Sequence, residues 1–569
     1  MEMKNIGEAS GIEQRSADEH HKPGPKPPTR TSAASGLATP PVGRWAKVHW
    51  ALLLVALVPL VVAGQGQHFF YDEWAYIGGK LDTIPLPDLY LLPHNEHWSS
   101  LPLLAYRTLR ASVGVGSYWP YLGLLLLLHL GVTHVLWRLM LVTGSKPIVA
   151  TALAAVFSVL GAGAEDLVWA FQISFVGSTL LGVSAVYLAV TGTASWRKTW
   201  VLAGLTLASL ATSGVGLAYL IVVPLVLAWR RRRYAVAAFG LPLLVYIMWH
   251  AEYGSSFEYP PNASANVPLM VGAFVTVGLT AALTGYFGFE TTSLVTHLVV
   301  GLPILAGIVL ACRALIASRT LASRTPVAMC VGAVAFFGAV GLARGGLGLS
   351  WAATSRYVYV AIALLLPVIA LAISRGTDQH PRLMTAIVPL AIAIALSNLF
   401  QLFAFAAQTR NKNNASRSVL AAAFNLVRSK EPIFMGQLPE PLLAPDLTTA
   451  DLKSRHLDPA FGGVSPGPSD RLTASFNLQI QVASVYDTGT ASPCSSTLGQ
   501  LFTIPTSRKT DPRFVMSADA WVAFTLQDAG VSSAQNWIYL PKGTYMINSL
   551  RDAGDLTIDS TSASLLAPC

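Results

Sequence analysis

Long apolar stretches, separated by short polar turns, occupy most of the first 408 residues. A helix needs about 20 mostly apolar residues to cross roughly 30 Å of hydrocarbon, so each such stretch predicts a membrane span. Eleven spans are predicted, near residues 47–64, 118–137, 147–163, 167–190, 200–215, 217–229, 234–250, 294–312, 326–343, 357–374 and 383–406. The pattern therefore predicts an all-α polytopic membrane bundle.

One further apolar stretch, 267–290, does not fit the alternation of inner and outer turns. If it crossed, the basic turn 313–324 would lie outside the cytoplasm, where Lys and Arg are normally sparse. We therefore interpret 267–290 as a re-entrant or interfacial helix, which is tolerated where protein or a water-filled cavity surrounds it. A conventional twelfth span is the alternative, and it would place the C-terminal region on the cytoplasmic side.

The two ends of the chain differ from its middle. Residues 1–43 are rich in Pro, Ser, Gly, Lys and Glu, which predicts a disordered cytoplasmic tail ahead of the membrane domain, 44–408. After Gln408, short alternating stretches replace the long apolar ones, which is typical of β-strands. Residues 409–569 are therefore predicted to be helical to about Ser429 and then to form a small β-sandwich. Eleven crossings place this mainly-β domain outside the cytoplasm.

Composition supports the membrane assignment. The 569 residues are 53% hydrophobic and 12% charged, with a mean hydropathy of +0.51, whereas a soluble domain carries about 25% charged residues. The net charge of +9 comes mainly from the predicted cytoplasmic turns, so it indicates topology and contact with anionic lipid and not nucleic-acid binding. Those turns carry Arg138/Lys146, Arg197/Lys198, Arg230 to Arg233, Arg313/Arg319/Arg324 and Arg375/Arg382.

Two adjacent carboxylates follow the first predicted span, in the stretch Phe69-Phe70-Tyr71-Asp72-Glu73-Trp74. Acids at the edge of the hydrocarbon are rare and often functional. Either Asp72 or Glu73 could act as a general base, since neighbouring aromatic rings can raise the pKa of a carboxyl group. The alternative is that Asp72 caps a helix at the membrane interface.

The same predicted outer loop contains Pro93-His94-Asn95-Glu96-His97-Trp98. His94, Glu96 and His97 could hold a divalent ion, donate hydrogen bonds to sugar hydroxyls, or belong to a solvated loop. Three-residue spacing alone is a weak zinc signal, and we favour substrate contact.

A second acidic pair, Glu165 and Asp166, lies at the outer end of the fourth predicted span. On a continuous helix, Glu165, Trp169 and Gln172 would share one face with Val176 and line a polar groove. Hydrogen bonding between helices by Gln172 is the simpler alternative.

Two arginines approach the outer boundary late in the membrane domain. Arg344 ends one predicted span, and Arg356 begins the next, followed by Tyr357. A guanidinium group matches the oxygens of a phosphate, so Arg356 in particular predicts binding of a phosphorylated lipid. Snorkelling toward lipid headgroups is the alternative for Arg344.

Four cysteines divide between the two predicted regions. Cys312 and Cys330 lie in or beside spans at the cytoplasmic side, whereas Cys494 and Cys569 lie in the predicted outer domain. An oxidising compartment permits a disulfide between the latter two.

Together these features resemble the GT-C class of polytopic membrane glycosyltransferases. The resemblance rests on Tyr71-Asp72-Glu73-Trp74 in the first outer loop, on many spans, on Arg356 at a late outer turn and on an outer C-terminal domain. The stretches His94-Asn95-Glu96-His97-Trp98 and Trp169-Ala170-Phe171-Gln172 are similar to those of other bacterial membrane proteins of this type.

The resemblance implies an enzyme of the bacterial plasma membrane, a hexosyl- or pentosyltransferase. Its donor would be a sugar on polyprenyl phosphate or diphosphate, and its acceptor an envelope glycan or lipid on the outer face. Transfer would invert the anomeric carbon, with Asp72 or Glu73 as base and Arg356 stabilising the departing phosphate. No cofactor is required by the sequence, and a divalent metal stays open.

Two other functions compete with sugar transfer: a transporter or flippase of lipid-linked sugars, and a non-catalytic envelope assembly factor. The absence of an internal repeat and the gathering of polar residues on one side, not at the midplane, argue against transport.

Overall fold

The computed structural model describes residues 37–38, 43–78, 82, 84–254, 266–289, 293–485, 501–506, 512–516, 518–560 and 565–566. Within these residues, nine helices are long and apolar enough to cross a membrane. They are α1 (Gly43–Gly64), α5 (Trp119–Val142), α8 (Ile173–Val190, with the preceding turn η3, Ala170–Gln172), α11 (Arg232–Glu252), α12 (Val267–Tyr286), α13 (Leu294–Ala317), α14 (Leu321–Arg344), α15 (Ser355–Gln379) and α16 (Leu383–Arg428). The chain is a multi-pass membrane protein.

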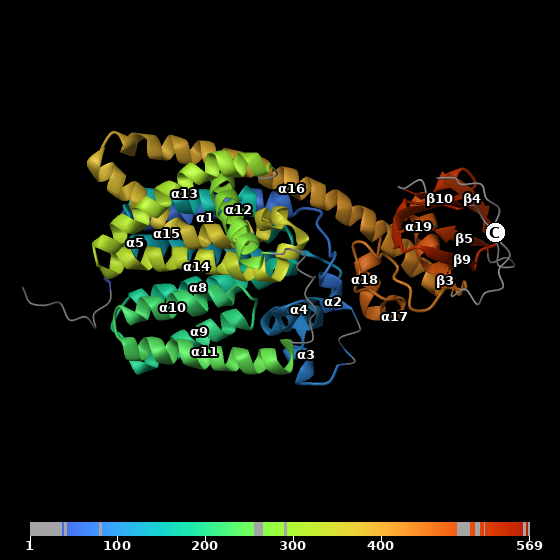
Figure 1. Ribbon diagram of the computed structural model, residues 1–569, viewed down its shortest axis with the longest axis horizontal. Helices are drawn as coiled ribbons and strands as arrows, with labels where there is room; N and C mark the ends of the chain where they lie inside the picture. The colour runs from blue at the N-terminus through green and yellow to red at the C-terminus, as the bar shows by residue number, and fades with distance from the viewer. Residues whose placement is uncertain are drawn as a thin grey trace, which may run out of the picture.

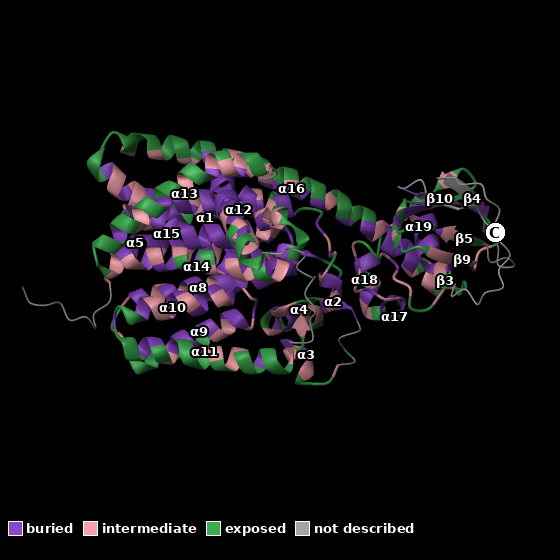
Figure 2. Cartoon of the chain, viewed as in Figure 1, coloured by how far each residue is buried: buried purple, intermediate pink, exposed green. Residues whose placement is uncertain are grey.

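Shorter helices complete the bundle: α6 (Pro147–Phe157), α9 (Trp196–Leu210) and α10 (Gly216–Ala228). Most of these helices run along the long axis of the molecule (Figure 1). Helix α15 lies buried in the middle, whereas exposed residues follow one another along α13 and α16 (Figure 2), and α1 carries others. Many of these are apolar, such as Leu54, Val299 and Phe400. An apolar surface of this kind matches a hydrocarbon solvent.

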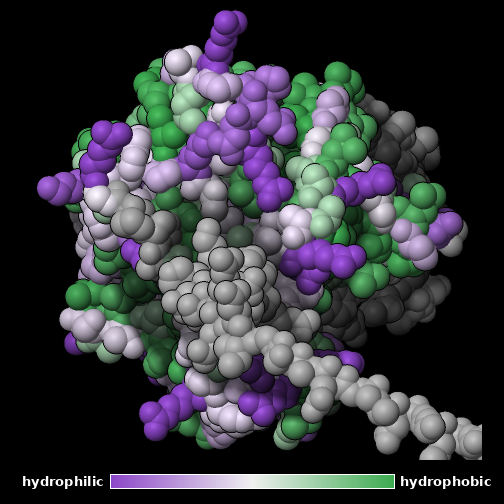
Figure 3. Space-filling view, turned by 90° about the vertical axis from the view of Figure 1, so that its left-hand side faces the viewer, coloured by the Kyte–Doolittle hydropathy of each residue, from purple (hydrophilic) through white to green (hydrophobic). Residues whose placement is uncertain are grey.

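The bundle has two chemically different ends. The end that carries residues 65–118, here called the loop end, holds α2 (Glu73–Ile77), α3 (Asp88–Leu91) and α4 (Ser100–Val113). At the opposite end, here called the turn end, hydrophilic side chains gather around the helix termini (Figure 3). Arg230 there donates to the carbonyl of Ala189, and Arg375 donates to Ser323. These bonds bring the basic turns to one face of the bundle.

Helix α12 begins at the loop end and ends against α16. Met270, in its first turn, packs against Gly345, just beyond the end of α14. After its last turn, the carbonyl of Gly288 accepts hydrogen bonds from Ser397 and Gln401 of α16. Figure 1 shows α12 running across the neighbouring helices. Helix α12 is also one of the nine helices long enough to cross a membrane among the described residues, so the re-entrant or interfacial helix at 267–290 stays a prediction.

Helix α16 continues without a break past residue 408, where the sequence predicted a boundary, and ends at Arg428 after 46 residues. The chain then forms α17 (Thr449–Lys453), η7 (Arg455–Leu457) and α18 (Asp458–Phe461) beside the first loop. His456 contacts the carbonyl of Ile77, and Phe461 stacks on Trp74. Segment 430–467 therefore packs directly on α2.

Two antiparallel sheets follow α19 (Pro468–Gln479). One contains β4 (Leu501–Pro505), β10 (Asp555–Ser560), β6 (Ala520–Asp528) and β7 (Val531–Ser532) in that order, with β8 (Asn536–Leu540) also paired to β6. The other contains β11 (Leu565–Leu566), β5 (Arg513–Met516), β9 (Gly543–Ser549) and β3 (Ile480–Val485). Side chains of both sheets and of α19 form one hydrophobic core, separate from that of the bundle.

Candidate functional site

Asp72 is presented by a strained turn at the loop end. The preceding residue, Tyr71, has a φ of 56°, a conformation that is uncommon for residues other than glycine. Its N–H donates to the carbonyl of Leu443, which holds the turn from the C-terminal side. Asp72 occupies the N-cap position of α2, but its side chain makes no capping hydrogen bond. Strain maintained in this way often marks a functional site, and the Asp72 carboxylate is not used as a cap.

The Asp72 carboxylate points toward charged partners from distant parts of the chain. Its Oδ1 lies 3.9 Å from Nε2 of His94. Burial raises its pKa to about 6, although the positive charges of Arg356 and Arg344 oppose that rise. A carboxyl group with this pKa is ionised at neutral pH and still basic enough to accept a proton.

Glu73, the adjacent acid, is turned into the protein. Its carboxyl group is fully buried and accepts hydrogen bonds from the hydroxyl groups of Tyr106 (2.6 Å) and Tyr118 (3.1 Å) and from the N–H of Phe70 (3.0 Å). Burial raises its pKa to about 8, against the opposing effect of these hydrogen bonds. Glu73 therefore ties α2 to α4 and α5, and it does not open toward His94 as Asp72 does.

The enclosure of Glu73 predicts a pH dependence of stability. Because its folded-state pKa lies above the ordinary value of 4.5, the folded protein retains a proton that the unfolded chain loses between the two values. The free energy of unfolding should fall as pH rises from about 4.5 to about 8. Glu73→Gln should reduce this decline, as measured by melting temperature across that range. If the melting temperature of Glu73→Gln falls with pH as steeply as that of the wild type, the buried Glu73 carboxyl group is not the cause of the pH dependence.

Residues 93–98 form a two-stranded hairpin, β1 (Pro93–His94) and β2 (His97–Trp98). His94 and His97 are cross-strand partners, and Asn95 in the turn has a φ of 51°. Asn is one of the residues that accepts this conformation in a tight hairpin. The hairpin therefore places both imidazoles and Glu96 at the loop end, above α8.

Glu96 pairs with Arg344 across the bundle. The guanidinium Nε donates to Glu96 Oε1 at 2.9 Å, and a second nitrogen bonds both carboxylate oxygens. Burial alone would raise the pKa of Glu96, but His97 and Arg344 hold it below its ordinary value. Burial lowers the pKa of His94 to about 4 and also lowers that of His97. The site thus contains an ionised Glu96 and two neutral imidazoles at neutral pH.

Arg356 forms a second ion pair, with Glu165. Its Nη1 donates to Glu165 Oε1 at 2.7 Å. The N–H of Glu165 in turn donates to Ser355, whose hydroxyl group donates to the carbonyl of Ala162. The Arg356 guanidinium also lies 5.4 Å from the ring of Tyr357. Asp72, Glu96, Arg344, Glu165 and Arg356 are therefore neighbours in one charged cluster.

The predicted shared face of Glu165, Trp169, Gln172 and Val176 is wrong. Helix α7 (Glu165–Val168) ends after four residues, Trp169 is extended, and η3 intervenes before α8. The hydroxyl group of Tyr118 accepts a hydrogen bond from the N–H of Ala170 at 2.7 Å, which satisfies the backbone at the break. The predicted span 167–190 consequently begins as a helix only at residue 170.

The polar residues around this helix break lie in different environments. Glu165 faces Arg356, whereas Asp166 and Gln172 are buried. Burial and the neighbouring Glu165 raise the pKa of Asp166 well above its ordinary value. Trp169 lies 5.1 Å from the ring of Phe70 and stacks on Phe171 at 5.2 Å.

Several residues around the site were not among the predicted site residues, although Phe171 belongs to the stretch Trp169-Ala170-Phe171-Gln172 that carries the resemblance. Tyr106 and Tyr118 fix Glu73, and Asp446, from segment 430–467, is close enough to raise the pKa of Asp72. Tyr76 and Phe171 add aromatic rings near His94. These residues come from five separate segments, so only folding brings them together.

A pocket of about 100 Å³ opens beside the Glu96–Arg344 pair. Its walls come from α8, α10, α11 and α14 and are mostly apolar, including Phe175, Tyr246 and Phe336. Glu96, His97 and Arg344 supply the charged or polar end, and Tyr357 also lines the pocket. The pocket is smaller than a typical ligand pocket, so it can take one small group between its charged end and its apolar walls.

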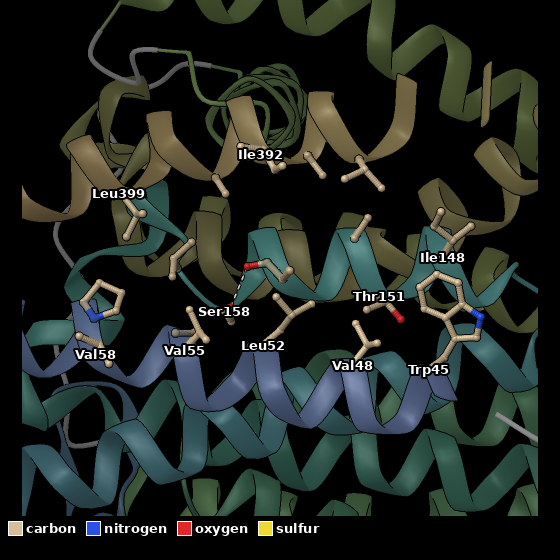
Figure 4. Close-up of a pocket in the computed structure, with 18 residues that line it drawn as sticks. Trp45, Val48, Leu52, Val55, Val58, Ile148, Thr151, Ser158, Ile392 and Leu399 are labelled. Atoms are coloured by element: carbon tan, nitrogen blue, oxygen red, sulfur yellow. Dashed lines mark hydrogen bonds between the residues drawn. The ribbon is translucent and has the colours of Figure 1, made fainter. Parts of the chain in front are cut away.

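A larger groove, of about 780 Å³, lies between α1, α6 and α16 (Figure 4). It is lined by apolar residues such as Leu52, Ile148 and Leu399, with Thr151 and Ser158 among the few polar groups. No Asp, Glu, Lys or Arg lines it. The groove suits hydrocarbon chains, but it lacks groups for acid–base chemistry.

The metal and disulfide expectations are not decided by these contacts. Among the described residues, no three His, Cys, Asp or Glu side chains are placed to hold one metal ion. The predicted Cys494–Cys569 disulfide lies outside the described residues. Cys312 and Cys330 are unbridged, with their sulfur atoms 3.8 Å apart between α13 and α14.

Comparisons with known proteins give one similar structure. No family model matches the chain, and no curated protein matches its sequence. Among solved structures, the chain is similar to ArnT from Cupriavidus metallidurans bound to undecaprenyl phosphate. The match has 13% sequence identity and a TM-score of 0.46, and it covers 77% of this chain and 92% of that one.

Proposed function

We propose that this protein transfers a sugar from a polyprenyl-phosphate-linked donor to an envelope glycan or lipid, on the outer face of a bacterial plasma membrane. The observation that carries the proposal is the cluster at the loop end: a largely buried carboxylate, Asp72, whose pKa is affected by the charges of Arg344 and Arg356, two arginines from late in the membrane domain. General-base chemistry and phosphate recognition require these two types of group within reach of each other.

The donor is proposed to bind through its phosphate and its hydrocarbon chain separately. The phosphate would contact Arg344 and Arg356, whose guanidinium groups are now held by Glu96 and Glu165. The prenyl chain would pass along the apolar walls of the pocket beside Arg344. A guanidinium group carries five N–H donors, so each arginine can keep its carboxylate partner and still donate to a phosphate oxygen.

Asp72 is proposed to be the general base. It takes the proton from an acceptor hydroxyl group as that oxygen forms a bond to the anomeric carbon. The bond from this carbon to the phosphate oxygen breaks, and the polyprenyl phosphate leaves with the electron pair, which inverts the configuration. Arg356 stabilises the negative charge that develops on the departing phosphate. No step in this scheme passes through a metal ion.

The remaining polar residues are proposed to orient the two substrates. His94 lies closest to Asp72 and can donate or accept with sugar hydroxyl groups, as can His97. The rings of Phe70, Tyr71 and Trp169 adjoin the Asp72 turn and offer surfaces on which a sugar can pack. Glu73 and Asp166 are positioning residues, because both are enclosed.

The proposed orientation follows from charge. Basic residues in short loops remain cytoplasmic, and the turns at the turn end carry Arg and Lys (Figure 3). The turn end and the N-terminus are therefore assigned to the cytoplasm. The loop end and the two C-terminal sheets are assigned to the outer side.

The proposal is tested with the purified full-length protein in liposomes. The assay supplies polyprenyl-phosphate-linked sugars labelled in the sugar, together with an envelope extract as acceptor, and measures label in the acceptor. Transfer that depends on the protein supports the proposal. Movement of the labelled donor between leaflets without transfer would identify a flippase instead. If the labelled donor is neither transferred nor moved between leaflets, whichever donor is supplied, the glycosyltransferase proposal is overturned. A non-catalytic assembly factor is then the function that fits.

A further inference from the structure

The outer surface of the five-stranded sheet carries three exposed aromatic side chains. They are Trp521 on β6 and Trp537 and Tyr539 on β8, and about half of each side chain is exposed. Large aromatic residues are rarely left on the surface of a small domain in a group, and a group of them marks an interaction site. We call this group the aromatic face.

Strand register places the three rings together. Trp521 is directly opposite Tyr539, and their ring centroids are 5.5 Å apart. Trp537 is opposite Ala523, two residues along from Trp521 on the same side of the strand. Ala523 itself is buried, so the exposed area at this part of the sheet belongs to the rings beside it. The arrangement is therefore a continuous aromatic surface across two strands.

Hydrogen-bonding groups continue the same surface across the neighbouring strands. Thr525 on β6 is opposite Thr557 on β10, which is opposite Thr503 on β4. Asp559 is opposite Ala523, and Asp555 is opposite Gln527. Because alternate residues share a face, these hydroxyl, amide and carboxylate groups lie on the side of the aromatic rings.

The charge of this surface excludes two common occupants. The five strands of the sheet contain Asp residues and no Lys or Arg. Phosphates of lipids or nucleic acids need positive charge, so neither fits here. The 46 residues of α16 span about 69 Å at 1.5 Å per residue, roughly twice the hydrocarbon thickness, which also carries the sheets away from the bilayer (Figure 1).

A neutral carbohydrate matches both halves of the surface. The C–H groups of a sugar ring pack against the negative face of an aromatic ring, and its hydroxyl groups bond to carboxylate, amide and hydroxyl side chains. We propose that the aromatic face binds a neutral glycan chain, with sugar rings stacked on Trp521 and Trp537 and hydroxyl groups directed to Asp559 and the threonine row. This inference goes beyond the transfer reaction and does not depend on it.

The test measures binding of soluble neutral polysaccharides, namely glucan, mannan, galactan and arabinan, to the full-length protein in nanodiscs by affinity electrophoresis. At least one should retard the protein, and Trp521→Ala and Trp537→Ala should each weaken that binding by about tenfold, the loss typical of a central aromatic contact. Trp521→Phe and Trp537→Phe retain an aromatic ring, so each should keep most of the polysaccharide binding. Trp200→Ala, a change at an exposed tryptophan of α9, serves as the matched control.

Two results would overturn the inference: no retardation by any of the four polysaccharides, or retardation that both alanine variants leave unchanged. A change in oligomeric state in the alanine variants, with polysaccharide binding intact, would instead identify a protein contact and also overturn it. Melting temperatures of the variants should match the wild type, because the rings lie on the surface. Sugar transfer to a short soluble acceptor should be unaffected, which separates this site from the proposed catalytic one.

Discussion

Replacing Asp72 with Asn should reduce the turnover number for sugar transfer by about 10²- to 10⁴-fold, the range that a positioned general base contributes. Asn keeps the size of the side chain and cannot accept the proton. Because the Asp72 side chain makes no capping hydrogen bond, the fold should be unaffected. Single-turnover transfer and donor binding are the measurements, and binding of the donor should change little.

The pH profile provides a second readout of the same residue. With the pKa of Asp72 near 6, wild-type turnover should rise as pH increases through about 6 and then level off. Asp82→Asn is the matched control, since Asp82 lies in the same loop but pairs with Arg107 and Arg110. Full activity in Asp72→Asn, or loss confined to Glu73→Gln, would assign the base to another residue.

Replacing Arg356 with Gln should reduce turnover by about 10²- to 10³-fold, as expected when one group that stabilises transition-state charge is removed. Arg356→Lys, which keeps the charge without the planar fork, should recover part of the loss. Arg356 also lowers the pKa of Asp72, so its removal should shift the rise in the pH profile to higher pH. Steady-state kinetics across pH measures both effects.

Glu165→Gln distinguishes a phosphate-binding arginine from a structural ion pair. If Arg356 serves only to hold Glu165, the two substitutions should damage the protein equally and lower its melting temperature together. If Arg356 binds the donor phosphate, Glu165→Gln should retain most of the turnover and should not weaken donor affinity. Equal losses of turnover in Glu165→Gln and Arg356→Gln would therefore contradict the assigned role.

The sequence was most informative for features that depend on a single physical requirement. Apolar length located nine helices long enough to cross a membrane among the described residues, and the alternation of basic turns singled out 267–290, which forms α12. Alternating residues after Gln408 indicated the sheets. The predicted helix to about Ser429 is confirmed, since α16 ends at Arg428. Apolar length alone stops near residue 408, and the last part of α16 instead packs on α19 and α17.

The site itself was predicted as a set of residue types and not as a geometry. The sequence could not choose between Asp72 and Glu73, because the choice depends on the left-handed backbone at Tyr71 and on Tyr106 and Tyr118, which are 33 and 45 residues away from Glu73. Pairing of Arg344 with Glu96 joins residues 248 positions apart. Helical spacing also failed at Trp169, where a hydroxyl group from α5 replaces the helical hydrogen bond.

A structure of the full-length protein with polyprenyl phosphate tests the central claim most directly. The account predicts a phosphate oxygen within about 3 Å of a guanidinium nitrogen of Arg344 or Arg356, with the Asp72 carboxylate facing the same space. A phosphate bound in the groove between α1, α6 and α16, or at the turn end, with both arginines still paired to Glu96 and Glu165, would contradict it.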